Sequence, residues 1–214
     1  MKRSTRTRLS RKPNRGSYDP AVIYPILDEG LFCHVSYQLE GQPYLIPMAY
    51  CRLEDTLYLH GSVGSHFMRE LAKGTDVCLA VTLMDGLVLA RSAFAHSVNY
   101  RSVIVFGRSR EITDEAERWR VFEQVLEHLI PGRWNDSRQP NASEVTKTML
   151  IAIPMEEASA KVRTGGVGEE PPSDLELPYW AGVIPLSVRV GTPWADAALP
   201  EDMVMPRYIE QYTR

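Results

Sequence analysis

The sequence has little cysteine and no long apolar run. Three cysteines are present, Cys33, Cys51 and Cys78, and no two have the close spacing of metal ligands. An odd, scattered set excludes a disulfide framework and a zinc knuckle, and it predicts buried thiols in a reducing compartment. No stretch approaches the roughly 18 consecutive apolar residues of a membrane span, and no apolar segment near the start resembles a secretory signal. We therefore expect a cytoplasmic protein.

The common cofactor motifs are also absent. The chain contains no G-x-G-x-x-G fingerprint, no Walker phosphate loop and no H-E-x-x-H zinc motif. Its composition, with 44% hydrophobic and 24% charged residues, is that of an ordinary globular protein. A length of 214 residues suits one domain with an elaborated tail. A nucleotide cofactor, if there is one, is bound without those motifs.

Acidic residues are missing from the first 15 positions. This segment holds seven basic residues: Lys2, Arg3, Arg6, Arg8, Arg11, Lys12 and Arg15. Since the chain has 24 basic and 27 acidic residues, the remainder has 17 against 27, a net charge of −10. A basic arm can bind nucleic acid or an anionic membrane, or it can dock on the acidic body of its own dimer. The arm has no aromatic residues for base stacking and too few apolar residues for a transit-peptide helix, so we predict a flexible arm over 1–15.

The spacing of apolar residues predicts several strands and few helices. Alternation indicates strands over 31–37, 44–51, 56–60, 77–83, 87–90 and 102–106, and 149–153 is the final core strand. Asp85-Gly86 is typical of a hairpin turn, and Gly107 of a break or bulge. Because the strands do not alternate regularly with helices, the pattern predicts a mainly β fold with added helices, a small barrel or sheet.

Three helices are expected between these strands. The first runs from an Asp19 cap to Gly30, with Pro25 kinking or shortening it. A second is capped by Ser62 or Ser65 and ends at Gly74. The third runs from a Thr113 cap to Ile130, with an apolar face of Trp119, Phe122, Val125, Leu126 and Leu129. After Arg163, a composition rich in Gly, Glu and Pro predicts a flexible or functional loop through Ser173.

Two segments carry candidate chemistry. In Leu57–His66 a strand ends in His60, and a Gly/Ser turn then opens a helix. Helix-start N–H groups beside two hydroxyls make an anion site, although an ordinary capped helix with His60 as a satisfied strand residue fits the pattern equally. In Asn99–Gly107, Arg101 can pair bidentately with a phosphate or a carboxylate, and its spacing favours a strand-edge ion pair.

Together these segments resemble the pyridoxamine phosphate oxidase-related FMN-binding proteins, nearest to the branch that includes the nitroimidazole-resistance reductases. The matching segments are Ile46–Tyr50, Tyr58–His60 with its Gly/Ser turn, and Tyr100–Gly107. Ala158–Gly165 is similar to a segment of close relatives. The resemblance covers about residues 15–180. It implies an FMN-binding split β-barrel, a two-fold homodimer and one FMN in each interface groove.

The resemblance also implies site residues. Pro47, Met48, Ala49 and Tyr50 would run along the isoalloxazine edge. His60 would lie near the flavin and substrate as the catalytic residue. The phosphate turn would comprise Gly61, Ser62, Ser65 and His66. Tyr100, Arg101 and Ser102 would approach FMN, some of them from the partner subunit, and Lys161, Arg163 and Trp180 would close the site. No metal site is expected.

The sequence departs from the oxidase pattern in the phosphate turn and at its end. After Ser65 stand His66 and Phe67 in place of a basic run, and the C-terminal substrate motif has no match. Both departures weigh against pyridoxamine phosphate oxidation. Ala95 precedes His96 where close relatives have a histidine pair.

We predict a basic arm over 1–15, a split-barrel FMN-binding domain over 16–164, and a C-terminal loop and tail over 165–214 that pack on the barrel. The expected function is that of an FMN-dependent oxidoreductase acting on a small molecule: a nitroaromatic, a quinone-like acceptor or a metabolite. The alternatives are a non-catalytic flavin-binding protein, a haem-binding protein with His60, His66 or His96 as ligand, and a fold that has lost its cofactor.

Overall fold

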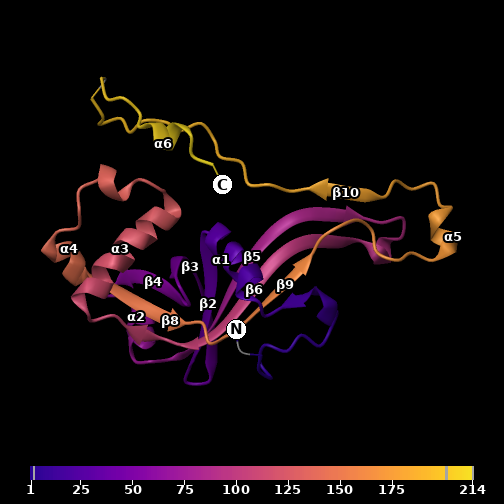
Figure 1. Cartoon of the computed structure of the whole chain (residues 1–214), viewed down its shortest axis with the longest axis horizontal. Helices are drawn as coiled ribbons and strands as arrows, with labels where there is room; N and C mark the ends of the chain where they lie inside the picture. The colour runs from indigo at the N-terminus through magenta and orange to yellow at the C-terminus, as the bar shows by residue number, and fades with distance from the viewer. Residues whose placement is uncertain (2, 201, 214) are drawn as a thin grey trace.

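One antiparallel sheet dominates the computed structural model, which describes residues 1, 3–200 and 202–213 (Figure 1). Its strands follow the order β1-β9-β6-β5-β2-β3-β4-β8-β7, and β10 pairs with β5. The strands are β1 (Gly16–Ser17), β2 (Phe32–Leu39), β3 (Gln42–Leu53), β4 (Thr56–Ser62), β5 (Asp76–Leu89), β6 (Ser97–Arg108), β7 (Arg110–Glu111), β8 (Thr148–Pro154), β9 (Glu157–Arg163) and β10 (Gly182–Pro185). Neither β9 nor β10 was expected from the sequence.

The sheet curls into a barrel. β8 and β9 stand toward opposite ends of the strand order, yet only residues 155 and 156 separate them in the chain. A Cβ at Gly107 would lie 2.7 Å from the Pro154 carbonyl oxygen, so β6 and β8 meet there. Gly107 therefore admits a neighbouring backbone, and the predicted break or bulge is wrong because β6 continues to Arg108. The predicted split β-barrel is confirmed.

Alternate side chains of the strands fill the barrel. In β2, Cys33, Val35 and Tyr37 are buried, and Phe32 is exposed on the other face. Burial raises the pKa of the Cys33 and Cys51 thiols to about 12. These thiols are therefore neutral at physiological pH and act as small apolar core groups, as predicted.

Six helices accompany the strands in the described part of the chain. They are α1 (Pro20–Glu29), α2 (His66–Ala72), α3 (Glu115–Leu129), α4 (Ala142–Lys147), α5 (Pro172–Leu175) and α6 (Arg207–Glu210), with 3-10 turns η1 (Pro13–Arg15), η2 (Ala93–Ala95) and η3 (Trp134–Asp136). The helices α5 and α6 lie away from the barrel (Figure 1). Asp19 caps α1 as predicted, by accepting the Ala21 N–H, and the helix continues through Pro25. Among the described helices, none has the length and apolar character needed to cross a bilayer.

The apolar face of α3 is rotated from the predicted one. The helix begins after Asp114, whose carboxylate accepts the Glu117 N–H, and not after Thr113. Its buried residues are Val121, Val125 and His128. Trp119 and Phe122, two of the predicted core residues, are only half buried. The Trp119 ring is tilted against Phe122 and lies edge-on to Trp134 of η3. A hydrogen bond from the His128 ring to the Gly30 carbonyl explains why a polar residue occupies the inner face.

β5 and β6 form a long hairpin that projects beyond the barrel (Figure 1). The predicted turn at Asp85-Gly86 is wrong: β5 passes through it with an irregularity in register between Met84 and Gly86, and the chain turns at η2. A Cβ on Gly86 would lie 3.0 Å from the Ile184 carbonyl oxygen. The glycine therefore serves the pairing with β10, a long-range contact that local pattern does not show.

Both ends of the chain contact the body of the protein. In the N-terminal arm, Arg6 forms an ion pair with Glu157 and its guanidinium lies over the Phe106 ring, while Thr7 is buried. These contacts tie the arm to its own chain at β6 and β9. After β10 the chain runs without regular secondary structure to α6, which lies near η3 and α3 (Figure 1).

Candidate functional site

β3 and β4 separate at Tyr50 and Leu59. From this pair toward the β3–β4 turn, residues 50–53 of β3 are hydrogen-bonded to residues 56–59 of β4. On the other side, β3 residues 42–49 pair with β2 alone, and β4 residues 60–62 pair with β8, within the part of the chain that the structure describes. Main-chain N–H and C=O groups on the facing edges therefore lack strand partners. We call this opening, from Pro47–Ala49 on β3 to His60–Ser62 on β4, the fork.

His60 lies at the apex of the fork. Its Nδ1 atom is buried and has no hydrogen-bond partner among the described residues. Burial lowers the pKa of His60 below its ordinary value, so the ring is neutral at physiological pH. A neutral imidazole has one N–H donor and one acceptor nitrogen. An unsatisfied buried nitrogen costs free energy, and a ligand group within hydrogen-bonding reach of Nδ1 would remove that cost.

The Gly/Ser turn has the geometry of a capped helix start. Ser65 Oγ accepts the Met68 N–H at 3.4 Å and caps α2, while Ser62 Oγ accepts the Gly64 N–H at 3.1 Å. A Cβ on Gly61 would lie 2.8 Å from Met68 Cγ, so this glycine lets α2 pack against β4. The first N–H groups of α2 have no partner within the helix. Their use, and that of the two hydroxyls, in binding a phosphate stays a prediction.

The β3 residues differ in what they can offer a ligand. Pro47 is exposed, whereas Met48 and Ala49 are half buried. Tyr50 is fully buried; its hydroxyl donates to the Leu27 carbonyl and its ring packs against His128. The Tyr50 side chain therefore belongs to the core, and its contribution to the fork is limited to the main chain.

Tyr100, Ser102, Lys161 and Arg163 form a second group on β6 and β9. The strand register pairs Tyr100 with Arg163 and Ser102 with Lys161, and Ser102 Oγ donates to the Lys161 carbonyl at 3.3 Å. In the sheet, β5 and β2 lie between this group and β3. One copy of the chain therefore presents two separate groups of predicted site residues.

Arg101 forms the ion pairs that its spacing favoured. Its guanidinium binds Glu29 at the end of α1 and Asp85 of β5. Both carboxylates raise its pKa further. The predicted strand-edge position is wrong, because β6 lies inside the sheet between β5 and β9. Both acidic partners lie far from Arg101 in the chain, so local pattern did not show them. A phosphate would compete with these two carboxylates for Arg101.

Arg163 fixes the loop that follows β9. Its side chain is buried; it donates to the Asn99 side-chain oxygen and, at 3.0 Å, to the Gly166 carbonyl. Asn99 also donates to the Gly165 carbonyl at 2.9 Å. Trp180, predicted to close the site, lies just before β10 with its ring over Gly182 and is largely exposed.

The outer face of the sheet is apolar and exposed. The register aligns Pro47, His34, Ala80 and Ile104 in one row across β3, β2, β5 and β6. Three large apolar residues lie on the same face, two positions or more from that row: Phe32, Leu45 and Met84, all exposed. We call this surface the outer face.

Comparison with known proteins identifies the family. The family model described as pyridoxamine 5'-phosphate oxidase matches residues 19–162. The flavocytochrome Anf3 from Azotobacter vinelandii is 36% identical over 98% of this chain and 97% of that chain, with a TM-score of 0.91. The FAD and heme binding protein from Mycobacterium smegmatis is 30% identical over 91% and 95%, with a TM-score of 0.87.

A proposed 5-nitroimidazole antibiotic resistance protein from Bacteroides thetaiotaomicron shares the fold, at 24% identity over 69% of this chain and 86% of that chain and a TM-score of 0.59. A search of curated proteins finds no match. The family model covers the barrel from α1 to Val162 of β9, and it includes the fork and every member of the second group of predicted site residues except Arg163. The chain belongs to the pyridoxamine 5'-phosphate oxidase family.

Proposed function

We propose that the protein binds a flavin at the fork and acts as an oxidoreductase on a small molecule. The observation that carries the proposal is the buried His60 Nδ1, which lacks a partner beside two open strand edges. Support comes from the two relatives that are 36% and 30% identical, one described as a flavocytochrome and the other as an FAD and heme binding protein.

The residues of the fork suit a planar heterocycle with polar edges. Main-chain groups of Pro47–Ala49 can hydrogen-bond the ring edge, and the neutral His60 can donate or accept one hydrogen bond. A bound flavin would supply the redox chemistry, and the protein would supply orientation and electrostatics. His60 is the catalytic residue of the proposal because it can hold a proton within reach of the substrate.

A homodimer would complete this site. Tyr100, Ser102 and Lys161 lie on strands separated from the fork within one copy. A two-fold partner would bring its own β6–β9 group to the fork and cover the apolar outer face. Permanent interfaces of this kind commonly bury more than about 2,000 Å².

The cofactor can be identified directly. We expect the purified protein to show flavin absorbance, and mass spectrometry of the heat-released cofactor separates FMN, the prediction from sequence, from FAD, which the mycobacterial relative's description favours. Bleaching by NAD(P)H supports an oxidoreductase, whereas bound flavin that resists reduction supports a storage protein. A folded protein that takes up neither flavin contradicts the proposal.

Haem is a second candidate cofactor, and His96 is its best-placed ligand. The His96 Nδ1 lies 2.9 Å from the Ser92 carbonyl oxygen, which can only accept, so Nδ1 carries the proton and Nε2 is free to bind iron. Nearby Phe94, 98% exposed, offers an apolar surface for a macrocycle. No cluster of three or more His, Cys, Asp or Glu side chains suited to a bare metal ion occurs in the described part of the chain.

A haem titration followed by the Soret band tests this second candidate. His96→Ala should abolish the shift that marks ligated haem and leave flavin content unchanged. His66→Ala is the matched control, because that ring is exposed on α2 and faces Glu70. Equal haem ligation in both variants contradicts the assignment of His96.

A further inference from the structure

The C-terminal segment between β10 and α6 crosses open space as a strap (Figure 1). We propose that the described residues 186–200 and 202–206, the C-terminal strap, pack on a second copy of this chain; the proposal rests on the homodimer described above. Both ends of the strap are tied to their own chain. Leu186 N–H donates to the Asp85 carbonyl at 3.1 Å, and Tyr212 beyond α6 donates to the Leu129 carbonyl at 2.7 Å.

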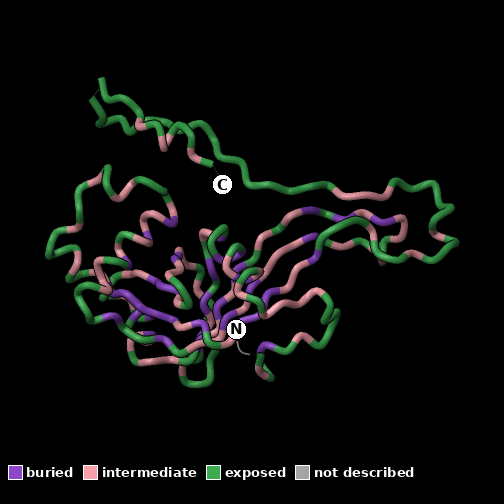
Figure 2. Tube along the Cα trace, in the orientation of Figure 1, coloured by how far each residue is buried: buried purple, intermediate pink, exposed green. Residues whose placement is uncertain are grey.

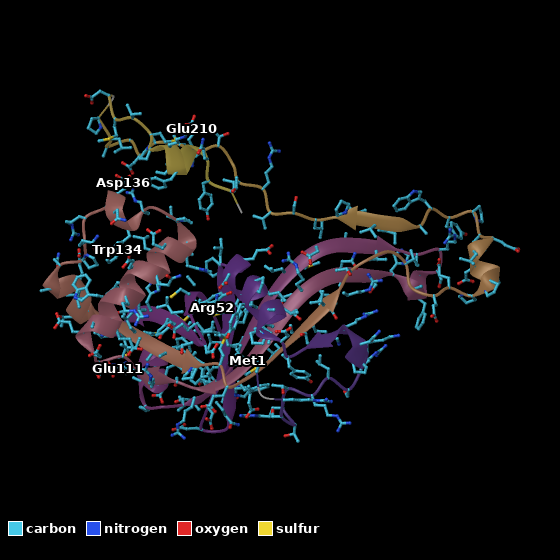
Figure 3. All side chains as sticks on the ribbon, viewed as in Figure 1. Met1, Arg52, Glu111, Trp134, Asp136 and Glu210 are labelled. Atoms are coloured by element: carbon cyan, nitrogen blue, oxygen red, sulfur yellow. The ribbon has the colours of Figure 1, made fainter. Side chains whose placement is uncertain are left out.

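The α6 end of the strap is anchored at η3. Tyr208 donates to Asp136 at 2.8 Å and accepts a hydrogen bond from Arg133 at 3.0 Å. In Figure 3, Glu210 of α6 lies close above the labelled Asp136 of η3. A segment with two fixed ends has a defined path, which distinguishes the strap from a free tail.

The composition of the strap is unlike that of a linker. It carries eight exposed large apolar residues: Leu186, Val188, Val190, Trp194, Leu199, Met203, Val204 and Met205. Trp194 is 87% exposed, Val204 81% and Val188 76%. Disordered linkers are poor in such residues, and irregular loops longer than about 12–15 residues are uncommon unless they have a function. The exposed trace of this segment in Figure 2 therefore marks a surface that another molecule should cover.

The strap does not bury these residues on its own chain. Near its α6 end, an open cavity of about 900 Å³ separates it from the α3–η3 region. Trp194 and Met203 of the strap line one side, and Ile130 and Arg133 line the other. Side chains that line an open cavity still expose apolar area, and burying that area against a second molecule is favourable.

A second copy is the occupant that the surface of the protein favours. The strap leaves its own chain at Asp85, next to Met84 of the apolar outer face. One copy thus exposes two adjoining apolar surfaces, the strap and the outer face. In a two-fold dimer, each subunit can cover both surfaces of its partner.

Photo-cross-linking of the full chain tests the proposal. The cross-linker p-benzoylphenylalanine is placed at position 188 or 194, with position 139 in the exposed loop before α4 as control, in a mixture of ¹⁴N- and ¹⁵N-labelled copies. We expect a product of twice the 24.2 kDa chain mass that contains mixed-isotope peptides, from positions 188 and 194 only. Cross-links confined to one copy, or a monomer by light scattering, overturn the proposal.

A variant gives a second measurement. Trp194→Ser should raise the dimer dissociation constant about tenfold or more, because buried tryptophans dominate interface energies; Arg189→Gln, an exposed neighbour on the strap, should leave it unchanged. An unaltered dissociation constant for Trp194→Ser counts against the strap. Flavin content is read from the same samples. A cross-linked dimer without flavin supports the strap and contradicts the flavin proposal alone, so the two failures are distinguishable.

Discussion

At the scale of single residues, His60 shows what the sequence could not decide. The pattern fitted a satisfied strand histidine as well as a ligand-facing one. The structure shows a ring nitrogen that the protein buries and does not satisfy. A core histidine such as His128, in contrast, bonds to the Gly30 carbonyl at 2.8 Å. This difference distinguishes the two residues and makes His60 the better candidate for a functional group.

The buried His60 should make stability depend on pH. Its pKa is lower in the folded state than in the unfolded chain, so the unfolded chain binds more protons as the pH falls. The contribution of neutral, buried His60 to stability is complete when the pH is above the unfolded-state pKa, near 6.5. It is lost as the pH falls from there toward the lower folded-state pKa. Urea denaturation of flavin-free protein at pH 8 and pH 5.5 should show a smaller pH dependence for His60→Gln than for wild type. An unchanged dependence would mean that the ring is not buried in solution; His66→Gln is the exposed control.

Ser65 separates capping from phosphate binding. Ser65→Ala removes the helix cap seen here and should cost about 1 kcal/mol of stability, and it should weaken flavin binding about tenfold if the hydroxyl also holds the phosphate. Ser65→Asp keeps a capping oxygen and adds a negative charge, so it should retain stability and still lose flavin affinity. Thermal denaturation and fluorescence-quenching titrations measure the two effects. Normal flavin binding by Ser65→Asp would place the phosphate elsewhere.

At the scale of elements, barrel closure depends on Gly107. Gly107→Ala would place a Cβ 2.7 Å from the Pro154 carbonyl oxygen and 2.9 Å from Ile153 Cγ2, and neither the backbone of β8 nor the buried Ile153 can move freely. We expect a loss of about 1–3 kcal/mol in the free energy of unfolding. Gly166→Ala, where a Cβ meets no atom within 4 Å, is the control and should be neutral or slightly stabilising. Equal stability of the two variants would show that β6 and β8 are not in close contact.

Local pattern predicted the elements whose partners are near in sequence. The alternation of β2 and the Asp19 cap of α1 were visible because burial and capping act over a few residues. β9 was missed because its Ala158–Ser159–Ala160 run lacks the β-branched residues that mark a strand. The Asp85-Gly86 turn signal was overridden by pairing with β10, about a hundred residues later. The capping box of Asn141 and Glu144 could have revealed α4.

The parts of the candidate site that are contiguous in sequence were predictable from local pattern. The strand end at His60 and the turn after it are contiguous in sequence, and the structure brings them to one place. The ion pairs of Arg101 and the burial of Tyr50 depend on residues from other elements, so local pattern could not show them.

At the scale of the whole molecule, the ion pair that joins the N-terminal arm to the barrel is partly exposed to solvent. Arg6 and Ser4 both bind Glu157 on β9, but Arg6 is half exposed and its ion pair is screened by solvent. Deleting residues 1–14 should therefore lower the melting temperature slightly and leave flavin affinity unchanged. Differential scanning calorimetry and a flavin titration measure both quantities, and Glu157→Gln in the full chain should reproduce the thermal effect. Loss of flavin on truncation would show that the arm belongs to the site.

Hydrogen–deuterium exchange with and without bound flavin tests the central claim most directly, that the fork is the flavin site. The open edges of the fork leave main-chain N–H groups without strand partners, so a ligand that bonds to them should slow their exchange. We predict protection concentrated in peptides covering residues 45–50 and 60–68, with further protection at 100–102 if a partner subunit contributes. Saturating flavin that leaves both fork peptides unchanged, while protecting other segments, would contradict the account.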